Sequence, residues 1–375
     1  MKILHLLTSI NTGGAEKFCV DICNTQAKIS DNEIFLCVLD SISEGQPLVN
    51  LISSDVNKIS LNKQGGYSLK MLYRIYRLLS KIKPDVIHLN GRALIYASIP
   101  ILIKKIPSIY TVHTMADKEY NKFIRQYVKM LFRVFPRIFI PVAISKAVGE
   151  SVKKIYGKYL DKVIVNGSSK LAISPDSDNI ADYINKLKKN DNTLVFIYIG
   201  RISMEKNTLM LVESFNRLLN DGCNVVLCII GFDNSRDMSY IEECKNNNRY
   251  PNEIQFVGRK ENIADYLKCA DALCLTSFYE GLGIAALEAF SMGVPVLSTP
   301  SGGPSDIIIS GLNGYVSKQT TKKSYIEILQ QFIKKPLKNK KTIIDIYKQN
   351  YTMEICASKY LNLYKNIQPG VLNKP

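Results

Sequence analysis

The sequence predicts an α/β protein of two domains, each with a parallel sheet connected by crossover helices. Apolar runs of about four to eight residues alternate with segments of helical period, which is typical of this architecture. The pattern occurs twice, once in each half of the chain. At 375 residues the chain also exceeds the roughly 250 to 300 residues at which a single core stops growing. Two cores are therefore expected, and a composition of 46% hydrophobic and 22% charged residues can fill both.

The first domain is predicted over residues 1–170. Apolar runs there indicate strands, with helices between them, at residues 2–7, 33–39, 85–88, 108–113, 139–144 and 162–165.

The second domain is predicted over residues 171–351, after a polar linker within residues 166–192. Its strands are expected at residues 194–199, 225–230, 253–257, 272–275 and 295–298. A last helical segment, residues 352–368, is expected to return to the first domain. Sheets of this kind bind ligands at the carboxyl ends of their strands, so two such domains facing one another would form a ligand site in an interdomain cleft.

Charge and cysteine content indicate a cytoplasmic protein with a polyanionic partner. The net charge is +16, and residues 1–170 carry 25 Lys+Arg against 12 Asp+Glu. Such a balance fits anionic lipid or nucleic acid. The nine cysteines form no C-x-x-C pair and are interpreted as small apolar residues in a reducing compartment. We expect no secretory signal, and no apolar run has the ~18 to 20 residues needed to span a bilayer.

A glycine-bearing turn follows the first predicted strand, in the segment from Ser9 to Glu16. Its backbone N–H groups would favour a phosphate or sugar oxygen at the start of a helix near Ala15, and a side chain at Gly13 or Gly14 would block that approach. A simple tight turn explains the two glycines equally well.

Two cations flank the end of the first strand of the second domain. Arg201 follows Gly200, and Lys206 lies five residues further on, before a helix expected from Asn207. A guanidinium fork and an ammonium point charge suit a diphosphate whose negative charge grows as it leaves. The alternative is a pair of solvated surface cations.

The most informative segment runs from Tyr279 to Thr299 and contains two glutamates, Glu280 and Glu288. With a helix starting near Gly283, Glu280 lies in the preceding loop, and Glu288 lies inside the helix among apolar residues. A carboxylate in such surroundings needs polar partners, and the hydroxyls of a ribose would supply them. The alternative is a helix-capping Glu280 and a surface Glu288.

These segments together resemble the retaining glycosyltransferases of family 4, which use sugar nucleotides and have the GT-B fold of two facing Rossmann-like domains. The resemblance covers nearly the whole chain. It depends on six segments in matching order and spacing: Gly13-Gly14-Ala15-Glu16, the end of the strand at Tyr110 to His113, Val165-Asn166-Gly167, Gly200-Arg201 with Lys206, Glu280 to Glu288, and Gly311-Leu312-Asn313-Gly314.

The resemblance implies a role for each site residue. Arg201 and Lys206 would hold the donor diphosphate, Glu288 the ribose and Glu280 the donor sugar, which His113 would approach from the first domain. These residues, Glu288 excepted, are the predicted catalytic residues. The predicted donor-binding residues are Gly13, Gly14, Gly200, Arg201, Lys206, Glu280, Gly281, Leu282, Gly283 and Glu288. No metal motif stands out, so no cofactor and no metal are expected. The resemblance further implies transfer with retention at the anomeric carbon.

Two cationic stripes in the first half predict a membrane or acceptor surface. Lys70, Arg74, Arg77 and Lys81 recur at helical steps, and a second basic amphipathic helix is expected to carry Lys118, Lys122, Arg125, Lys129 and Arg133. Anionic lipid of the inner leaflet is the expected partner, and a solvated helix face is the alternative.

The sequence therefore predicts a metal-independent hexosyltransferase that is peripheral on the inner face of the cell membrane. Its donor is expected to be a UDP-sugar ahead of GDP-mannose. Its acceptor is expected to be lipid-linked or a saccharide, in the synthesis of O antigen, capsule or lipopolysaccharide. A sugar-nucleotide epimerase or another enzyme with the same cleft is the alternative. A nucleic-acid-binding protein is disfavoured because no helix-turn-helix, finger or RNP-like signature is found.

Overall fold

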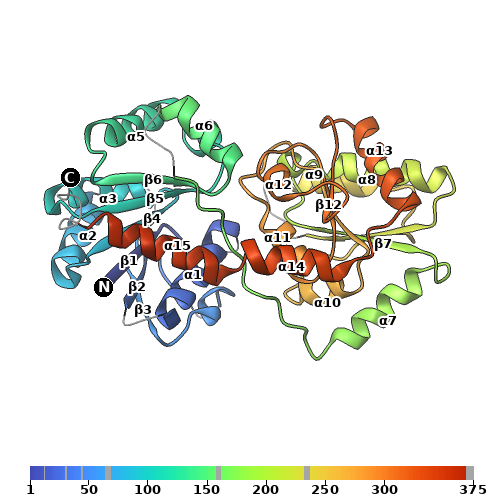
Figure 1. Ribbon diagram of the computed structural model, residues 1–375, viewed down its shortest axis with the longest axis horizontal. Helices are drawn as coiled ribbons and strands as arrows, with labels where there is room; N and C mark the ends of the chain where they lie inside the picture. Colours follow the sequence, from blue (N-terminus) through green and yellow to red (C-terminus); the bar gives the residue numbers. More distant parts are fainter. Residues whose placement is uncertain are drawn as a thin grey trace. The chain divides into compact units, whose positions relative to one another are not determined.

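The structure, a computed structural model, describes residues 1–11, 13–29, 32–43, 45–63, 69–157, 162–231 and 237–368. The chain divides into two compact units. Unit 1 comprises Met1–Ser169 and Tyr351–Pro375, and unit 2 comprises Lys170–Asn350. Each unit is a parallel β-sheet covered by helices (Figure 1), so the predicted α/β class is confirmed.

Unit 1 has a six-stranded parallel sheet in the order β3-β2-β1-β4-β5-β6. Its strands are β1 (Lys2–Leu7), β2 (Glu33–Val38), β3 (Val56–Ser60), β4 (Val86–Asn90), β5 (Ser108–Val112) and β6 (Phe139–Ala143). Its helices are α1 (Gly14–Ile29), η1 (Val49–Leu51), α2 (Leu69–Ile82), α3 (Ala93–Lys104), α4 (Ala116–Glu119), α5 (Lys122–Val134), α6 (Lys146–Tyr156) and α15 (Met353–Asn366).

Two strand predictions for unit 1 differ from the structure. The strand expected at residues 162–165 is reduced to one bridge between Val163 and Ala143. The edge strand β3 was not predicted, because its sequence VNKIS lacks a continuous apolar run and only Val56 is fully buried. Edge strands have one open side, so polar residues are common in them.

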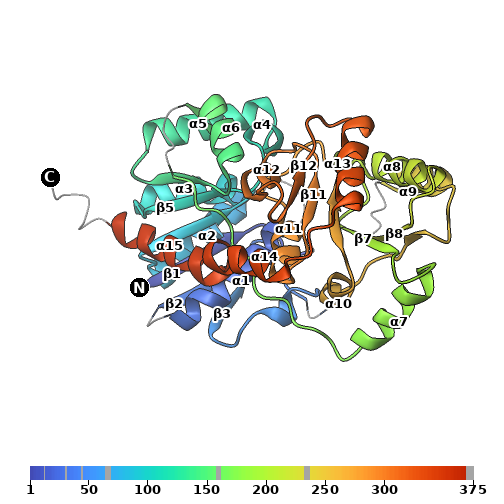
Figure 2. The same ribbon diagram turned by 45° about the vertical axis from the view of Figure 1, so that its right-hand side comes forward.

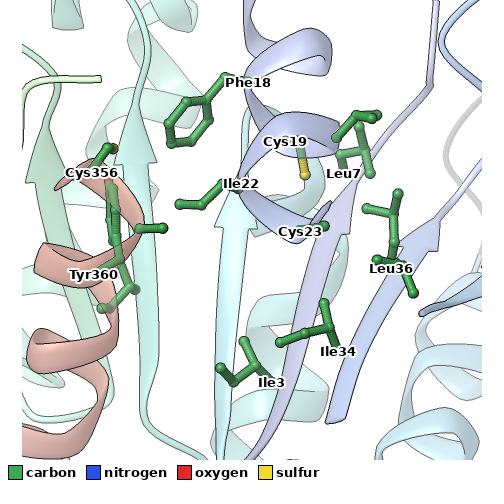
Figure 3. Close-up of a cluster of buried hydrophobic side chains, with 14 of the residues drawn as sticks. Ile3, Leu7, Phe18, Cys19, Ile22, Cys23, Ile34, Leu36, Cys356 and Tyr360 are labelled. Carbon is green, nitrogen blue, oxygen red and sulfur yellow. The ribbon is translucent and has the colours of Figure 1, made fainter. Parts of the chain in front are cut away.

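The core of unit 1 contains residues from both ends of the chain, β1 and α1 near its start and α15 near its end (Figure 3). Side chains alternate along β1, so Ile3 and Leu7 face α1, which contributes Phe18 and Ile22. The returning C-terminal helix α15 lies beside α1 on the same face of the sheet, where its Tyr360 and Tyr364 hydroxyls contact Thr111 of β5 and His88 of β4 (Figures 1 and 2).

The entry of the chain into α15 is fixed by a glycine. A Cβ atom at Gly167 would lie 2.4 Å from the carbonyl oxygen of Thr352, so the two backbone segments meet only because residue 167 has no side chain. Ser168 and Thr352 form a parallel bridge at the same place. The C-terminal segment is thereby integrated into unit 1.

Unit 2 repeats the architecture with the order β12-β11-β10-β7-β8-β9, again parallel. Its strands are β7 (Leu194–Ile199), β8 (Val225–Ile230), β9 (Ile254–Phe256), β10 (Ala272–Leu275), β11 (Val296–Ser298) and β12 (Gly314–Val316). Its helices are α7 (Ser177–Leu187), η2 (Met204–Lys206), α8 (Thr208–Asn220), α9 (Met238–Asn246), α10 (Ile263–Lys268), α11 (Ile284–Ser291), α12 (Gly303–Ile307), α13 (Lys322–Lys334) and α14 (Lys340–Asn350).

Two features of unit 2 were not predicted. The strand β12 is an edge strand that begins at Gly314 and contains only two apolar residues, so it forms no apolar run. The helix α7 lies inside the stretch expected to be a linker; it packs on α10 through Ile184, which is fully buried. Close to its start, Ser174 donates two hydrogen bonds to the buried carboxylate of Asp265, one of them from its backbone nitrogen at 2.9 Å.

Both sheets reverse their direction of strand addition at one point, between β1 and β4 in unit 1 and between β7 and β10 in unit 2. Open α/β sheets bind ligands beyond the carboxyl ends of the strands at such a point. In unit 2 this position is occupied by the residues that follow Ile199 and Leu275.

Candidate active site

The first part of the candidate site is the turn after β7. The strand ends at Ile199, Gly200 and Arg201 follow, and the short helix η2 brings Lys206 back over the edge of the sheet. Asn207 ends this turn in a left-handed conformation, with φ of 52°, and the next residue begins α8. The predicted start of a helix at Asn207 is confirmed.

The second part is the loop after β10, which pairs directly with β7. It carries Glu280, whose Oε1 atom accepts a hydrogen bond from Lys206 Nζ at 2.5 Å and another from Ser277 Oγ at 2.8 Å. The side chains of Lys206 and Glu280 are 25% and 13% exposed. The structure thus brings together two residues that the sequence analysis assigned to the diphosphate and to the sugar.

Backbone contacts hold this loop on both sides. Thr276 Oγ1 donates to the carbonyl oxygen of Lys206 at 2.9 Å, and the Phe278 nitrogen donates to that of Glu205 at 3.0 Å. On the opposite side the Glu280 nitrogen donates to the carbonyl oxygen of Ser301 at 2.7 Å. A Cβ atom at Gly303 would lie 2.2 Å from the carbonyl oxygen of Gly281, so the loop packs there against bare backbone. Such restraint suits a ligand site that is formed before its ligand binds.

Gly281, Leu282 and Gly283 connect this loop to α11. Leu282 is buried, and Gly283 precedes the helix with φ of 81°, a conformation that favours glycine. The predicted helix start near Gly283 is therefore confirmed.

Glu288 lies within α11 and is 5% exposed. Its neighbours along the helix, Ala286, Leu287, Ala289 and Phe290, are completely buried. The alternative of a surface Glu288 is therefore wrong, and the apolar surroundings expected for this carboxylate are confirmed.

Arg201 forms an ion pair with Glu205, with 2.8 Å between Nη2 and Oε2. Its side chain is 35% exposed, so solvent and ligands can reach the guanidinium. The same Glu205 accepts the Phe278 backbone hydrogen bond, which places Arg201 at the edge of the Glu280 loop.

In unit 1 the predicted site residues lie at the ends of β1 and β5. Gly13 precedes α1, and Gly14 is its first residue. His113 follows β5, and its Nε2 atom lies 2.9 Å from Oδ1 of the buried Asn90 at the end of the neighbouring β4. The Phe18 ring packs edge-on to the imidazole, with 5.3 Å between the ring centroids. Burial lowers the pKa of His113 from 6.5 to about 4, so the ring is neutral at pH 7.

A second buried polar group in unit 1 was not predicted. Tyr110 Oη donates to Glu119 Oε1 and lies 2.9 Å from Tyr120 Oη, which in turn donates to the carbonyl oxygen of Gly91. Burial raises the pKa of Glu119 to about 7, and the hydrogen bond from Tyr110 offsets only part of this rise. The pKa of Tyr110 is raised, first by burial and then by the Glu119 charge.

Sequence reasoning missed the polar partners Glu205, Ser277 and Asn90. Glu205 could have been found, because it lies four residues after Arg201 at the spacing of a helical ion pair. Asn90 is a polar residue that ends an apolar strand. Ser277 carries no distinguishing signal beyond its place three residues before Glu280.

The predicted cationic surface is only partly as expected. Lys70, Arg74, Arg77 and Lys81 are all exposed on α2. The second stripe does not form a single helix: Lys118 lies in α4, whereas Lys122, Arg125, Lys129 and Arg133 lie in α5. The break occurs because Tyr120 is extended and buried, and Asn121 caps α5 by accepting from the Ile124 nitrogen at 3.0 Å.

Large apolar side chains are exposed on the same two helices. Phe123 on α5 is 86% exposed and Leu69 on α2 is 83% exposed. Within the described residues, none of the helices combines the length and the apolar character that crossing a membrane requires.

Comparison with known families identifies the chain. Residues 161–349 match the model of the glycosyl transferases group 1 family, and residues 12–167 match that of glycosyltransferase family 4. The chain belongs to the glycosyl transferases group 1 family. The resemblance stated from the sequence is confirmed, and the two six-stranded sheets are those of a GT-B glycosyltransferase.

Three relatives of this glycosyltransferase show how far the similarity extends. An uncharacterized glycosyltransferase of Methanocaldococcus jannaschii is 26% identical over 65% of this chain and 63% of its own length. The UDP-Gal:α-D-GlcNAc-diphosphoundecaprenol α-1,3-galactosyltransferase of Escherichia coli is 26% identical over 70% of this chain and 69% of its own. The crystal structure of Anabaena HepE in complex with UDP and glucose superposes with a TM-score of 0.81, at 20% identity and over 98% of this chain and 100% of that one.

Proposed function

We propose that this glycosyltransferase transfers a hexose from a nucleoside-diphosphate sugar to a lipid-linked or saccharide acceptor, and that unit 2 binds the donor. The observation that carries the proposal is the contact of Lys206 with Glu280 at the carboxyl ends of β7 and β10, the reversal point of the sheet. A cation and a carboxylate held together there can bind the two halves of a sugar diphosphate.

The diphosphate is assigned to Arg201 and Lys206. Both are partly exposed cations on one turn after β7. Arg201 forms an ion pair with Glu205, and Lys206 forms one with Glu280. A bound diphosphate would replace or share these carboxylate contacts. As the bond to the sugar breaks, two fixed cations stabilise the developing negative charge, so we propose that transfer needs no metal ion.

The ribose is assigned to Glu288. Glu288 is 5% exposed and lies in α11, which begins directly after the Gly281–Gly283 loop. A vicinal diol offers two donors to the two carboxylate oxygens, and Gly281 and Gly283 in the preceding loop let a ligand approach the backbone.

Glu280 suits a binding role better than a nucleophilic one. Its Oε1 atom already accepts hydrogen bonds from an ammonium and from a hydroxyl group, which lowers its nucleophilicity. We therefore propose retention by attack on the same face: the bond between the anomeric carbon and the phosphate oxygen breaks, the acceptor oxygen bonds on that face, and the leaving phosphate takes the acceptor proton. The neutral His113 is proposed to hydrogen-bond the donor sugar.

The donor and acceptor classes are proposed from relatives. The Escherichia coli relative is named for a UDP-sugar donor and an undecaprenol-linked acceptor, and the HepE structure is named for bound UDP. Both favour a UDP-sugar donor, and the Escherichia coli relative favours an acceptor on a lipid diphosphate, as in the assembly of O antigen or capsule.

An acceptor of that kind lies in a membrane, and unit 1 offers a surface for it. The four exposed cations of α2 and the cations of α5, of which Lys122 and Arg133 are exposed and Arg125 and Lys129 half-buried, would lie at anionic headgroups. Phe123 and Leu69 would insert between the headgroups. We propose that the protein works at the inner face of the cell membrane, in the cytoplasm, and that nucleic acid is not a partner.

Product analysis tests this function. The full chain is incubated in EDTA with UDP-sugars or GDP-mannose and an undecaprenyl diphosphate-linked saccharide, and the product is examined by NMR. We expect a glycoside with the anomeric configuration of the donor. Loss of turnover on chelation would overturn the assignment as metal-independent. A product of inverted anomeric configuration would overturn the assignment as retaining. Conversion of the donor sugar without acceptor would favour an epimerase.

A further inference from the structure

A second cluster of chemically reactive side chains lies in the core of unit 1. His5 of β1 and Cys19 and Cys23 of α1 are each completely buried. Their ligand-forming atoms, one ring nitrogen and two sulfur atoms, all lie within 4.8 Å of one another. Figure 3 shows both cysteines on the turns of α1 that face the sheet.

Local structure explains how the three residues meet. Cys19 and Cys23 are four residues apart on α1 and so project from the same helix face. His5 lies on the same face of β1 as Ile3 and Leu7, the face directed at α1. All three side chains are completely buried, so the imidazole and the two thiols are isolated from water.

One ring nitrogen of His5 forms a hydrogen bond, and the other forms none within the described residues. Its Nε2 atom lies 2.8 Å from Oε1 of the buried Gln26, whose Nε2 atom donates to Tyr364 Oη at 3.3 Å. The amide oxygen can only accept, so the His5 proton is on Nε2 and the lone pair is on Nδ1. Within the described residues, Nδ1 of this buried ring has no hydrogen-bond partner. A carbonyl oxygen on one ring nitrogen, with a lone pair on the other, is the arrangement found for histidine ligands of metal ions.

The thiols are also suited to bind a cation. Asn90 Nδ2 lies 3.6 Å from Cys19 Sγ and donates to it, which stabilises a thiolate. Two thiolates and a neutral imidazole around Zn²⁺ have no net charge, which reduces the cost of burial. Thiolate and imidazole ligands select soft cations with filled d shells.

We propose that His5 Nδ1, Cys19 Sγ and Cys23 Sγ bind one thiophilic d¹⁰ cation, Zn²⁺ or Cu⁺. Each thiol loses its proton to solvent as its sulfur–metal bond forms, so binding is tighter at higher pH. The ion would link α1 to β1. This metal site does not depend on the proposed transferase function. It gives Cys19 and Cys23 a ligand role beyond the apolar packing predicted from the sequence.

Metal stoichiometry tests the site in the full chain. The reduced protein is incubated with Zn²⁺, or with Cu⁺ under anaerobic conditions, then desalted and analysed for metal. The variants are Cys19→Ala and Cys23→Ala, and the control is Cys356→Ala, a buried thiol of the same core on α15. We expect about one retained ion in the wild type and the control, and less than about a tenth of an ion in either variant. The ion that is retained decides between Zn²⁺ and Cu⁺.

Co²⁺ provides a measurement that needs no variant. Bound by two thiolates, it gives thiolate-to-cobalt charge-transfer absorption in the near ultraviolet, and Zn²⁺ should abolish that absorption by displacement. Circular dichroism checks the fold of each variant. The proposal is overturned if the wild type retains neither Zn²⁺ nor Cu⁺ and shows no cobalt–thiolate absorption, or if folded Cys19→Ala and Cys23→Ala retain as much metal as Cys356→Ala.

Discussion

Lys206 Nζ donates a hydrogen bond to Glu280 Oε1 at 2.5 Å, joining two residues that are 74 positions apart in the chain. The contact spans the ends of β7 and β10 at the point where strand order reverses. Because Ser277 and the backbone of the Ser301 loop hold the glutamate, both charges are in position before any ligand binds.

Lys206→Met should lower kcat/KM for the nucleotide sugar by about 10²- to 10³-fold, because a cation that stabilises the leaving group is lost. Lys322→Met is the matched control. Lys322 is exposed and pairs with Glu213 on the surface of the same unit, and it should change kcat/KM less than about twofold. Steady-state kinetics compare the two, and equal rates in both variants would remove Lys206 from the catalytic residues.

Ser277→Ala should reduce kcat about two- to twelvefold through the loss of one hydrogen bond to Glu280, a contribution of about 0.5 to 1.5 kcal/mol. Affinity for the free nucleotide diphosphate should not change, because Ser277 holds the residue assigned to the sugar. Ser214→Ala removes a buried hydroxyl from α8 of the same unit and serves as the control. A weakened nucleotide affinity with unchanged kcat would contradict this positioning role.

Features that depend on a local sequence pattern were predicted, whereas features that depend on contacts between distant residues were not. Buried strands such as β7 and β8 are continuous apolar runs, so their bounds were predicted correctly. The edge strands β3 and β12 carry no such run. The burial of Glu288 could be predicted from its apolar neighbours in the helix. The Ser277–Glu280 and His113–Asn90 contacts depend on how loops fold at the edge of the sheet, and no local sequence pattern predicts them.

His113 should make the protein less stable as pH falls below 6.5. Its pKa is about 4 in the folded chain, against an ordinary value of 6.5, so between these values the unfolded chain binds more protons at this residue. The difference in unfolding free energy between wild type and His113→Gln should therefore shift against the wild type by about 2 kcal/mol from pH 7.5 to 5, because pH 5 lies about 1.5 units below the ordinary pKa of 6.5. Urea unfolding of both proteins measures it, and a difference independent of pH would show that His113 titrates normally.

Neutralising α5 should weaken binding to anionic vesicles without affecting the donor. Lys122, Arg125, Lys129 and Arg133 are replaced by Gln, and co-sedimentation should fall by at least about tenfold, since each cation near the surface contributes about 1 kcal/mol. The control replaces four exposed lysines of unit 2, Lys334, Lys335, Lys338 and Lys341, and so loses the same charge. Equal sedimentation of both variants would mean that the α5 stripe is only a solvated face.

Binding of UDP in excess EDTA, measured by isothermal titration, tests the donor site most directly. The wild type should bind without metal, and Arg201→Ala and Glu288→Gln should each weaken binding by about 10- to 100-fold, the equivalent of one charged hydrogen bond of about 1.5 to 3 kcal/mol. Glu288→Gln preserves shape and packing in α11, so its loss of affinity would report the carboxylate itself. Unchanged affinity in both variants would contradict the assignment of the donor nucleotide to unit 2.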